Sequence, residues 1–217
     1  MMEKKLLALG SNGKLIVKSV SGKELSLSSN FSTSQGGKAV VFLLVDCSAS
    51  MQGEGIKQAK QGTLDFSRTA IKKGYLVGLI KFDSSAELLC EPTARFPLIS
   101  SKIEEFTAAG DTNLTEALRI VCQKLIGKQG YRGVVVATDG YPNESSSALE
   151  IAEEMKKDKI EILAISTPEA DQDFLSRLVS RKDLNLRMRE NQFKEGLNLM
   201  AGKLPFKALG HSKQDGF

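Results

Sequence analysis

Four nearly continuous apolar stretches occur along the middle of the chain. They cover residues 39–45, 75–82, 131–138 and 160–166. Runs of this kind are typical of strands that are buried on both faces of a parallel sheet. Two shorter segments add to the sheet: residues 86–90 predict a strand paired as a hairpin with the one before it, and residues 184–188 predict an edge strand.

Between these strands, apolar residues recur every three or four positions, which predicts amphipathic helices. We expect helices over residues 56–72, 99–106, 114–125, 144–157, 171–180 and 192–204. Thr112 is expected to be the N-cap of the helix that begins near Leu114. The alternation of strands and helices predicts an α/β fold: a doubly wound, mainly parallel six-stranded sheet flanked by helices.

The two ends of the chain have a different character from the middle. Residues 4–28 contain short segments with β character, separated by Ser, Asn and Gly turn signals, which predict a hairpin or a small sheet. The Ser- and Gly-rich residues 29–38 predict a linker. We therefore expect an N-terminal β extension and linker over residues 1–36, a main domain over residues 37–204 and a loose tail over residues 205–217.

Composition narrows the class of protein. The apolar fraction of 41% and the charged fraction of 26% are ordinary for a globular domain, and no stretch of about 18 apolar residues predicts a membrane span. The first apolar run is too short for a secretory signal, so we expect a cytoplasmic protein. The three cysteines lack metal-binding spacing and are expected to be reduced thiols, most of them buried.

Oxygen-bearing side chains follow two of the predicted strands. In a doubly wound sheet the first and fourth strands lie side by side, which brings Asp46 and Asp139 together at the carboxyl ends of their strands. Ser48 and Ser50 lie in the turn after Asp46, and Thr112 joins them if its loop crosses the same edge. Two carboxylates balance one divalent cation, and hydroxyls add ligands without charge, so this set predicts a site for Mg²⁺.

The residues of this predicted site resemble a known motif. The DxSxS pattern of Asp46, Ser48 and Ser50, the threonine Thr112 of GDTN and Asp139 of TDG are similar to the metal-ion-dependent adhesion site of von Willebrand factor A domains. The resemblance covers roughly residues 37–204, and its motif is completely filled. Residues 1–36 lie outside it.

The resemblance implies a Rossmann-like fold with Mg²⁺ or Mn²⁺ at its top. Ser48, Ser50 and Thr112 would coordinate the ion directly, and Asp46 and Asp139 directly or through water. It also implies a scaffold or protein-interaction module whose partner presents an Asp or Glu to the metal. Cytoplasmic microbial members resemble scaffolds that work beside AAA ATPases, chelatases or stress-response systems, and in some relatives the last helix, here residues 192–204, shifts.

The sequence gives little support for an enzyme. Serine hydrolases need a base, yet the only histidine is His211 in the tail, and neither GxSxG nor a phosphate-binding GxxxxGK[ST] loop occurs. We therefore expect no enzyme. A metal-assisted phosphatase with Asp46 as nucleophile stays an alternative, although Ser48 stands where haloacid-dehalogenase-like enzymes carry a second Asp.

Nucleic-acid binding is the other alternative. Residues 1–38 hold six lysines against Glu3 and Glu24, and this excess accounts for the formal charge of +4. A basic segment of this kind can contact phosphates. No aromatic side chains are interleaved with the lysines for base stacking, so a solvated lysine-rich hairpin fits the pattern better, and we expect neither nucleic acid nor membrane as a partner.

Overall fold

The chain separates into two units, residues 1–36 and residues 37–217. The structure, a computed structural model, describes residues 6–9, 15–18, 24–26, 37–140 and 144–205. Most of the predicted linker and all but the first residue of the predicted tail lie outside these ranges. In the first unit, β1 (Leu6–Leu9), β2 (Leu15–Lys18) and β3 (Glu24–Ser26) form an antiparallel sheet in the order β1-β2-β3.

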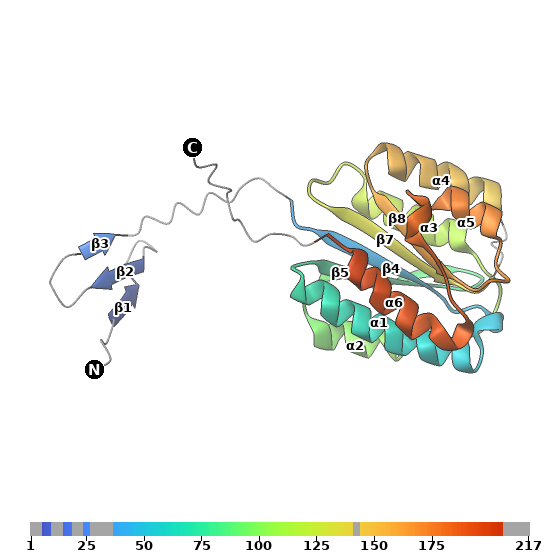
Figure 1. Ribbon diagram of the computed structural model, residues 1–217, viewed down its shortest axis with the longest axis horizontal. Coiled ribbons are helices and arrows are strands. Elements are labelled where there is room, and N and C mark those ends of the chain that lie inside the picture. Colours follow the sequence, from blue (N-terminus) through green and yellow to red (C-terminus); the bar gives the residue numbers. More distant parts are fainter. Residues whose placement is uncertain (1–5, 10–14, 19–23, 27–36, 141–143, 206–217) are drawn as a thin grey trace. The chain divides into compact units, whose positions relative to one another are not determined.

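The second unit contains a six-stranded sheet in the order β6-β5-β4-β7-β8-β9 (Figure 1). Its strands are β4 (Val40–Asp46), β5 (Leu76–Phe82), β6 (Ala86–Thr93), β7 (Arg132–Thr138), β8 (Glu161–Ser166) and β9 (Asn185–Arg187). All neighbouring pairs are parallel except β5 and β6, which form the predicted hairpin. The predicted doubly wound, mainly parallel sheet is therefore confirmed.

Helices cover both faces of this sheet (Figure 1). One face carries α1 (Glu54–Lys72), α2 (Phe96–Ile103) and α6 (Phe193–Lys203), and the other carries α3 (Leu114–Leu125), α4 (Ser145–Lys157) and α5 (Gln172–Leu178). Successive residues of the central strand β4 alternate between two apolar cores. Val41 and Leu43 pack into the first core, and Phe42 and Leu44 pack into the second. The continuous apolar run thus serves both faces.

Some predicted boundaries were wrong. α2 begins at Phe96 rather than at residue 99, because Pro97 occupies its first turn, where the fixed φ of proline favours helix and the missing N–H costs nothing. β6 continues to Thr93 instead of ending at residue 90. Among the described residues, no helix is both long enough and apolar enough to cross a membrane.

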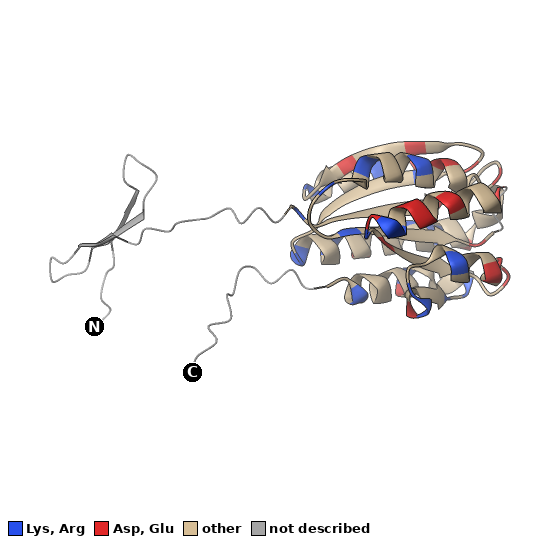
Figure 2. Ribbon diagram, turned by 90° about the horizontal axis from the view of Figure 1, so that it is seen from above, with Lys and Arg blue, Asp and Glu red and all other residues tan. Residues whose placement is uncertain are grey.

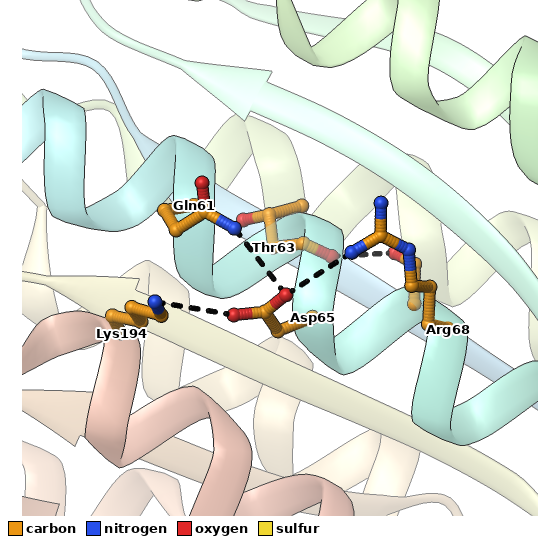
Figure 3. A network of polar contacts seen from close by, with 6 residues as sticks. Gln61, Thr63, Asp65, Arg68 and Lys194 are labelled. Atoms are coloured by element: carbon orange, nitrogen blue, oxygen red, sulfur yellow. Dashed lines mark hydrogen bonds and ion pairs between the residues drawn. The ribbon is translucent and has the colours of Figure 1, made fainter.

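Helices α1 and α6 pack closely because a glycine lies between them. A Cβ atom added to Gly62 of α1 would lie 2.8 Å from the Cα atom of Lys194 and 2.7 Å from Cδ1 of Leu197, both in α6. Polar contacts border this seam (Figure 3): the Asp65 carboxylate lies 3.7 Å from Nζ of Lys194 and 3.4 Å from a guanidinium nitrogen of Arg68. The exposed pairs contribute little, so the close packing at Gly62 holds α6 against α1 more than these pairs do.

This packing predicts opposite effects for two Gly-to-Ala substitutions. Alanine favours a helix over glycine by about 1 kcal/mol. We expect Gly62→Ala nevertheless to destabilise the domain by about 1–3 kcal/mol, because its methyl group meets the backbone of α6. Gly202→Ala, in α6 with no atom within 4 Å of its added Cβ, is the matched control and should stabilise. Urea unfolding measures both, and stabilisation by Gly62→Ala would contradict the close-packed seam.

Candidate metal centre

The two predicted carboxylates lie at the ends of adjacent strands. β4 and β7 are parallel neighbours, and their register pairs Val45 with Ala137, so that Asp46 and Thr138 come next at the same edge of the sheet. The carboxyl ends of parallel strands are where α/β folds collect ligands. The sheet order therefore brings together residues that are about ninety positions apart in the sequence.

Asp46 is fully buried, and both of its carboxylate oxygens accept hydrogen bonds. The backbone N–H of Ser48 donates to Oδ1 over 2.8 Å, and the hydroxyl of Thr138 donates to Oδ2 over 2.5 Å. The first bond shapes the turn after β4, and the second joins β7 to β4. Asp46 is thus fixed in place by groups from both strands.

A chain of hydroxyls connects this turn to the second carboxylate. Oγ of Ser50 donates to Oδ1 of Asp139 over 2.9 Å and lies 3.0 Å from Oγ of Ser48. The backbone carbonyl of Asp139 accepts from the hydroxyl of Thr167, which follows β8, over 3.1 Å. Four of the predicted site residues therefore belong to one polar cluster at the carboxyl edge of the sheet.

The fifth predicted residue, Thr112, lies beside Gly140 at the margin of this cluster, but its predicted role as N-cap was wrong. Asn113 caps α3 instead: its side chain accepts from the backbone N–H of Glu116 over 3.1 Å. Because the side chain of Asn113 accepts a hydrogen bond from a backbone N–H in the first turn of α3, the hydroxyl of Thr112 is not needed as the cap of this helix. Thr112 is only 8% exposed, and its Oγ1 would lie 3.4 Å from a Cβ atom added to Gly140, the residue after Asp139.

Burial at this edge of the sheet disfavours the charged forms of the two carboxylates. Burial raises the pKa of Asp46 from 3.8 to about 6, against the opposing effect of its hydrogen bonds with Ser48 and Thr138. Burial likewise raises the pKa of Asp139, and the hydrogen bond from Ser50 opposes this shift. Desolvation of negative charge is the dominant cause at both residues. A bound cation would offset this cost.

The donor set fits a hard divalent cation. Asp46 and Asp139 supply carboxylate oxygens, while Ser48, Ser50 and Thr112 supply hydroxyl oxygens. A hydroxyl that donates its proton to a carboxylate still has lone pairs for a metal ion. Among the described residues, no group of three or more His, Cys, Asp or Glu side chains is placed to hold a metal ion, so the two carboxylates of this cluster would need the hydroxyl oxygens as further ligands.

Two residues of the cluster were missed by the sequence analysis, Thr138 and Thr167. Each stands at or just after the end of an apolar strand, directly beside the positions that were considered. Their contribution depends on the register between neighbouring strands, which apolar periodicity leaves open. The sequence signal that could have found them is a threonine at the end of an apolar run, next to a strand that ends at Asp46 or just before Asp139.

Comparison with known families agrees with the fold. The model of the von Willebrand factor type A domain matches residues 40–199, which is more than half of the chain. The chain belongs to this family. Von Willebrand factor A domains generally mediate protein–protein interactions and often bind a divalent metal ion. No curated protein matches the sequence.

Solved structures share the fold of this von Willebrand factor A domain. The vWF domain of the type V pili tip protein Mfa5 from Porphyromonas gingivalis has a TM-score of 0.72 at 11% identity, with 83% of this chain and 99% of that one covered. Proximal thread matrix protein 1 from the mussel byssus has a TM-score of 0.64 at 15% identity. In that structure, zinc occupies the metal-ion-dependent adhesion site (MIDAS) motif. The match covers 77% of this chain but only 46% of the mussel protein.

A third similar structure is BatB from Bacteroides thetaiotaomicron, with a TM-score of 0.59, 14% identity, and 76% and 96% of the two chains covered. At these identities the likeness concerns the fold. The expected cytoplasmic location of this von Willebrand factor A domain stays a prediction, because one of the similar structures is a pilus tip protein.

The buried charge of Asp46 predicts how stability depends on pH without metal. Because its pKa is higher in the folded than in the unfolded state, the folded protein holds the proton more tightly, and stability falls as the pH rises from 3.8 to about 6. In EDTA, Asp46→Asn should therefore stabilise the domain at pH 8, by at most about 3 kcal/mol, and by much less at pH 4.5.

Urea unfolding at both pH values measures this difference. Asp111→Asn is the matched control, since Asp111 is an exposed carboxylate in the loop that carries Thr112. It should change stability little at either pH. A loss of stability in Asp46→Asn at pH 8 would show that the buried charge is not the dominant cost.

Proposed function

We propose that the domain is a metal-dependent protein-interaction module with an intact metal-ion-dependent adhesion site. Asp46, Ser48, Ser50, Thr112 and Asp139 would hold Mg²⁺ or Mn²⁺, and a partner's Asp or Glu would complete its coordination. The ion would supply a positive charge that attracts this carboxylate. The family resemblance favours a scaffold beside an AAA ATPase or stress-response complex as the setting.

The observation that carries the proposal is the convergence of the five side chains at one edge of the sheet. The bond from Ser50 to Asp139 and the bond from Thr138 to Asp46 both cross between the two strand ends. A site with two protein carboxylates usually keeps some coordination positions for water or an outside oxygen. A partner carboxylate can take such a position, and its contact with the ion makes binding depend on the metal.

We also propose that the domain has no catalytic role. Nucleophilic attack by Asp46, as in a metal-assisted phosphatase, needs a carboxylate oxygen that can reach a phosphorus atom. Asp46 is fully buried, and hydrogen bonds engage both of its oxygens. These features support a carboxylate that orients the site over one that attacks a substrate.

Metal binding is tested first, on the purified protein. At a Mg²⁺ concentration 100-fold above the dissociation constant, we expect the wild type to gain about 2.7 kcal/mol of stability. Asp46→Asn, which keeps the shape of the side chain but removes its charge, should gain almost none. Asp111→Asn should respond like the wild type. Thermal unfolding with Mg²⁺ and with EDTA measures all three proteins.

Partner binding is tested by affinity capture from native lysate with the same three proteins. We expect a partner to be retained by the wild type and by Asp111→Asn in Mg²⁺, and to be lost in EDTA and with Asp46→Asn. Substitution of the partner's contacting Asp or Glu should abolish retention. Equal retention under all conditions, with Mg²⁺ binding intact, would refute the partner-carboxylate mechanism and leave the metal with a structural role.

A further inference from the structure

A basic hollow lies at the edge of the sheet opposite the metal centre. β7 runs from Arg132 to Thr138, and its first residue lines a hollow of about 400 Å³, while its last residue bonds Asp46. The hollow is bordered by the turn after α3 and by the end of α4, which contribute Lys128, Lys157 and Lys159. Figure 2 shows several Lys and Arg bands at this end of the domain.

Arg132 forms the floor of the hollow and already has its own partners. Its guanidinium lies 2.5 Å from Oδ2 of Asp158 and also donates to the backbone carbonyls of Leu125 and Asp158. These contacts join the ends of α3 and α4. The Nε atom of Arg132 is buried and has no hydrogen-bond partner among the described residues.

The three lysines of the rim have no such partners. Lys128, Lys157 and Lys159 are exposed, and none of them forms an ion pair within the part of the chain that the structure describes. The adjacent Lys156 differs: its Nζ lies 2.5 Å from Glu153. Asp158 also lines the hollow, but its carboxylate is paired with Arg132, and Lys157 has only a coulombic interaction with Glu153 that is not an ion pair. Three ammonium groups without ion pairs among the described residues therefore surround a single hollow.

Helix capping does not account for these lysines. Cations near a helix C-terminus are favourable, and both α3 and α4 end here. However, the carbonyl of Leu125 already accepts from Arg132, and α4 closes with backbone bonds from Lys159 to Lys156 and from Ile160 to Met155. Lys159 adopts φ +61°, a left-handed conformation that favours glycine. A lysine at this position costs stability.

We propose that this hollow binds a multivalent oxyanion of the phosphate class. One carboxylate would leave two of the three ammonium groups without a counter-charge, whereas a phosphate, pyrophosphate or phosphate ester matches several of them at once. No aromatic side chain lines the hollow, so the contact is to phosphate oxygens and not to a nucleobase.

Residues 1–36 and 206–217 do not provide an anion of this class. Gly37, where the main domain begins, lies against Gln129 and Gly130 at the rim of the hollow: a Cβ on Gly37 would come within 1.9 Å of the carbonyl oxygen of Gln129. The sequence before it is basic, with five lysines and two glutamates in residues 1–36, and residues 206–217 hold two lysines and one aspartate. Neither terminal segment supplies a suitable negative charge.

Calorimetric titration with inorganic pyrophosphate and tripolyphosphate, in EDTA and at constant ionic strength, tests the proposal without involving the metal centre. We expect the triple variant Lys128→Gln, Lys157→Gln, Lys159→Gln to bind at least tenfold more weakly than the wild type. The matched control is Lys57→Gln, Lys72→Gln, Arg95→Gln, which removes the same charge from exposed positions without ion pairs among the described residues of α1 and the start of α2. It should bind like the wild type.

A second variant separates weaker binding from a loss of folding. Lys159→Gly removes one charge and also relieves the left-handed strain, so it should raise the thermal midpoint while it weakens pyrophosphate binding several-fold. A hexaglutamate peptide serves as the competing class of ligand. The proposal fails if the wild type binds neither phosphate probe, if both triple variants weaken binding equally, or if the peptide binds as tightly as tripolyphosphate.

Discussion

The parallel pairing of β4 with β7 is the constraint on which the candidate metal centre depends. Each strand carries its carboxylate at its end, and only their adjacency lets Thr138 bond Asp46 and Ser50 bond Asp139. Parallel neighbours require crossover connections, so the strands between which the site forms are distant in sequence. The helices that make these crossovers also bury both faces of β4. This burial fixes the position of Asp46, the last residue of the strand.

The same burial makes the site electrostatically incomplete on its own. A carboxylate that is shielded from water favours its protonated form, and hydrogen bonds from Ser48 and Thr138 offset only part of that preference. The hydroxyl groups are neutral, so they orient the carboxylates without cancelling their charge. A divalent cation would cancel it. In the proposed function, the stability lost to buried negative charge would thus be the counterpart of affinity for a metal ion.

The strands of the sheet could be predicted from short-range signals in the sequence, whereas the meeting of Asp46 with Asp139 followed from the strand order that the fold class implies. Apolar runs identify buried strands, and the strand order of a doubly wound fold places Asp46 beside Asp139. Thr138 was not found, because its bond to Asp46 depends on the register between two strands. The N-cap was assigned to Thr112 instead of Asn113, because both residue types cap helices and only the backbone geometry decides between them.

The basic hollow could not be predicted from the sequence, although the sequence contains all of its lysines. Lys128 and Lys157 belong to different crossovers and meet only because α3 and α4 end at the same edge of the sheet. Whether a lysine has an acidic partner depends on which side chains the fold brings near it. Lys156 forms an ion pair with Glu153, whereas the next residue, Lys157, forms none among the described residues. The sum of charges along the sequence indicates a basic segment only at residues 1–38, because the positive and negative charges of the remaining residues cancel.

The last helix illustrates how packing limits the ways in which the domain can respond to a partner. Nζ of Lys73 donates to the carbonyls of Ala201, Gly202 and Leu204 over 2.7–2.9 Å, and the hydroxyl of Tyr75 donates to the carbonyl of Pro205. A cation at the C-terminus of a helix also opposes the negative end of its dipole. A shift of α6 would have to break these bonds and the close contact at Gly62. Binding at the metal centre with α6 in place therefore requires less reorganisation than binding coupled to its movement.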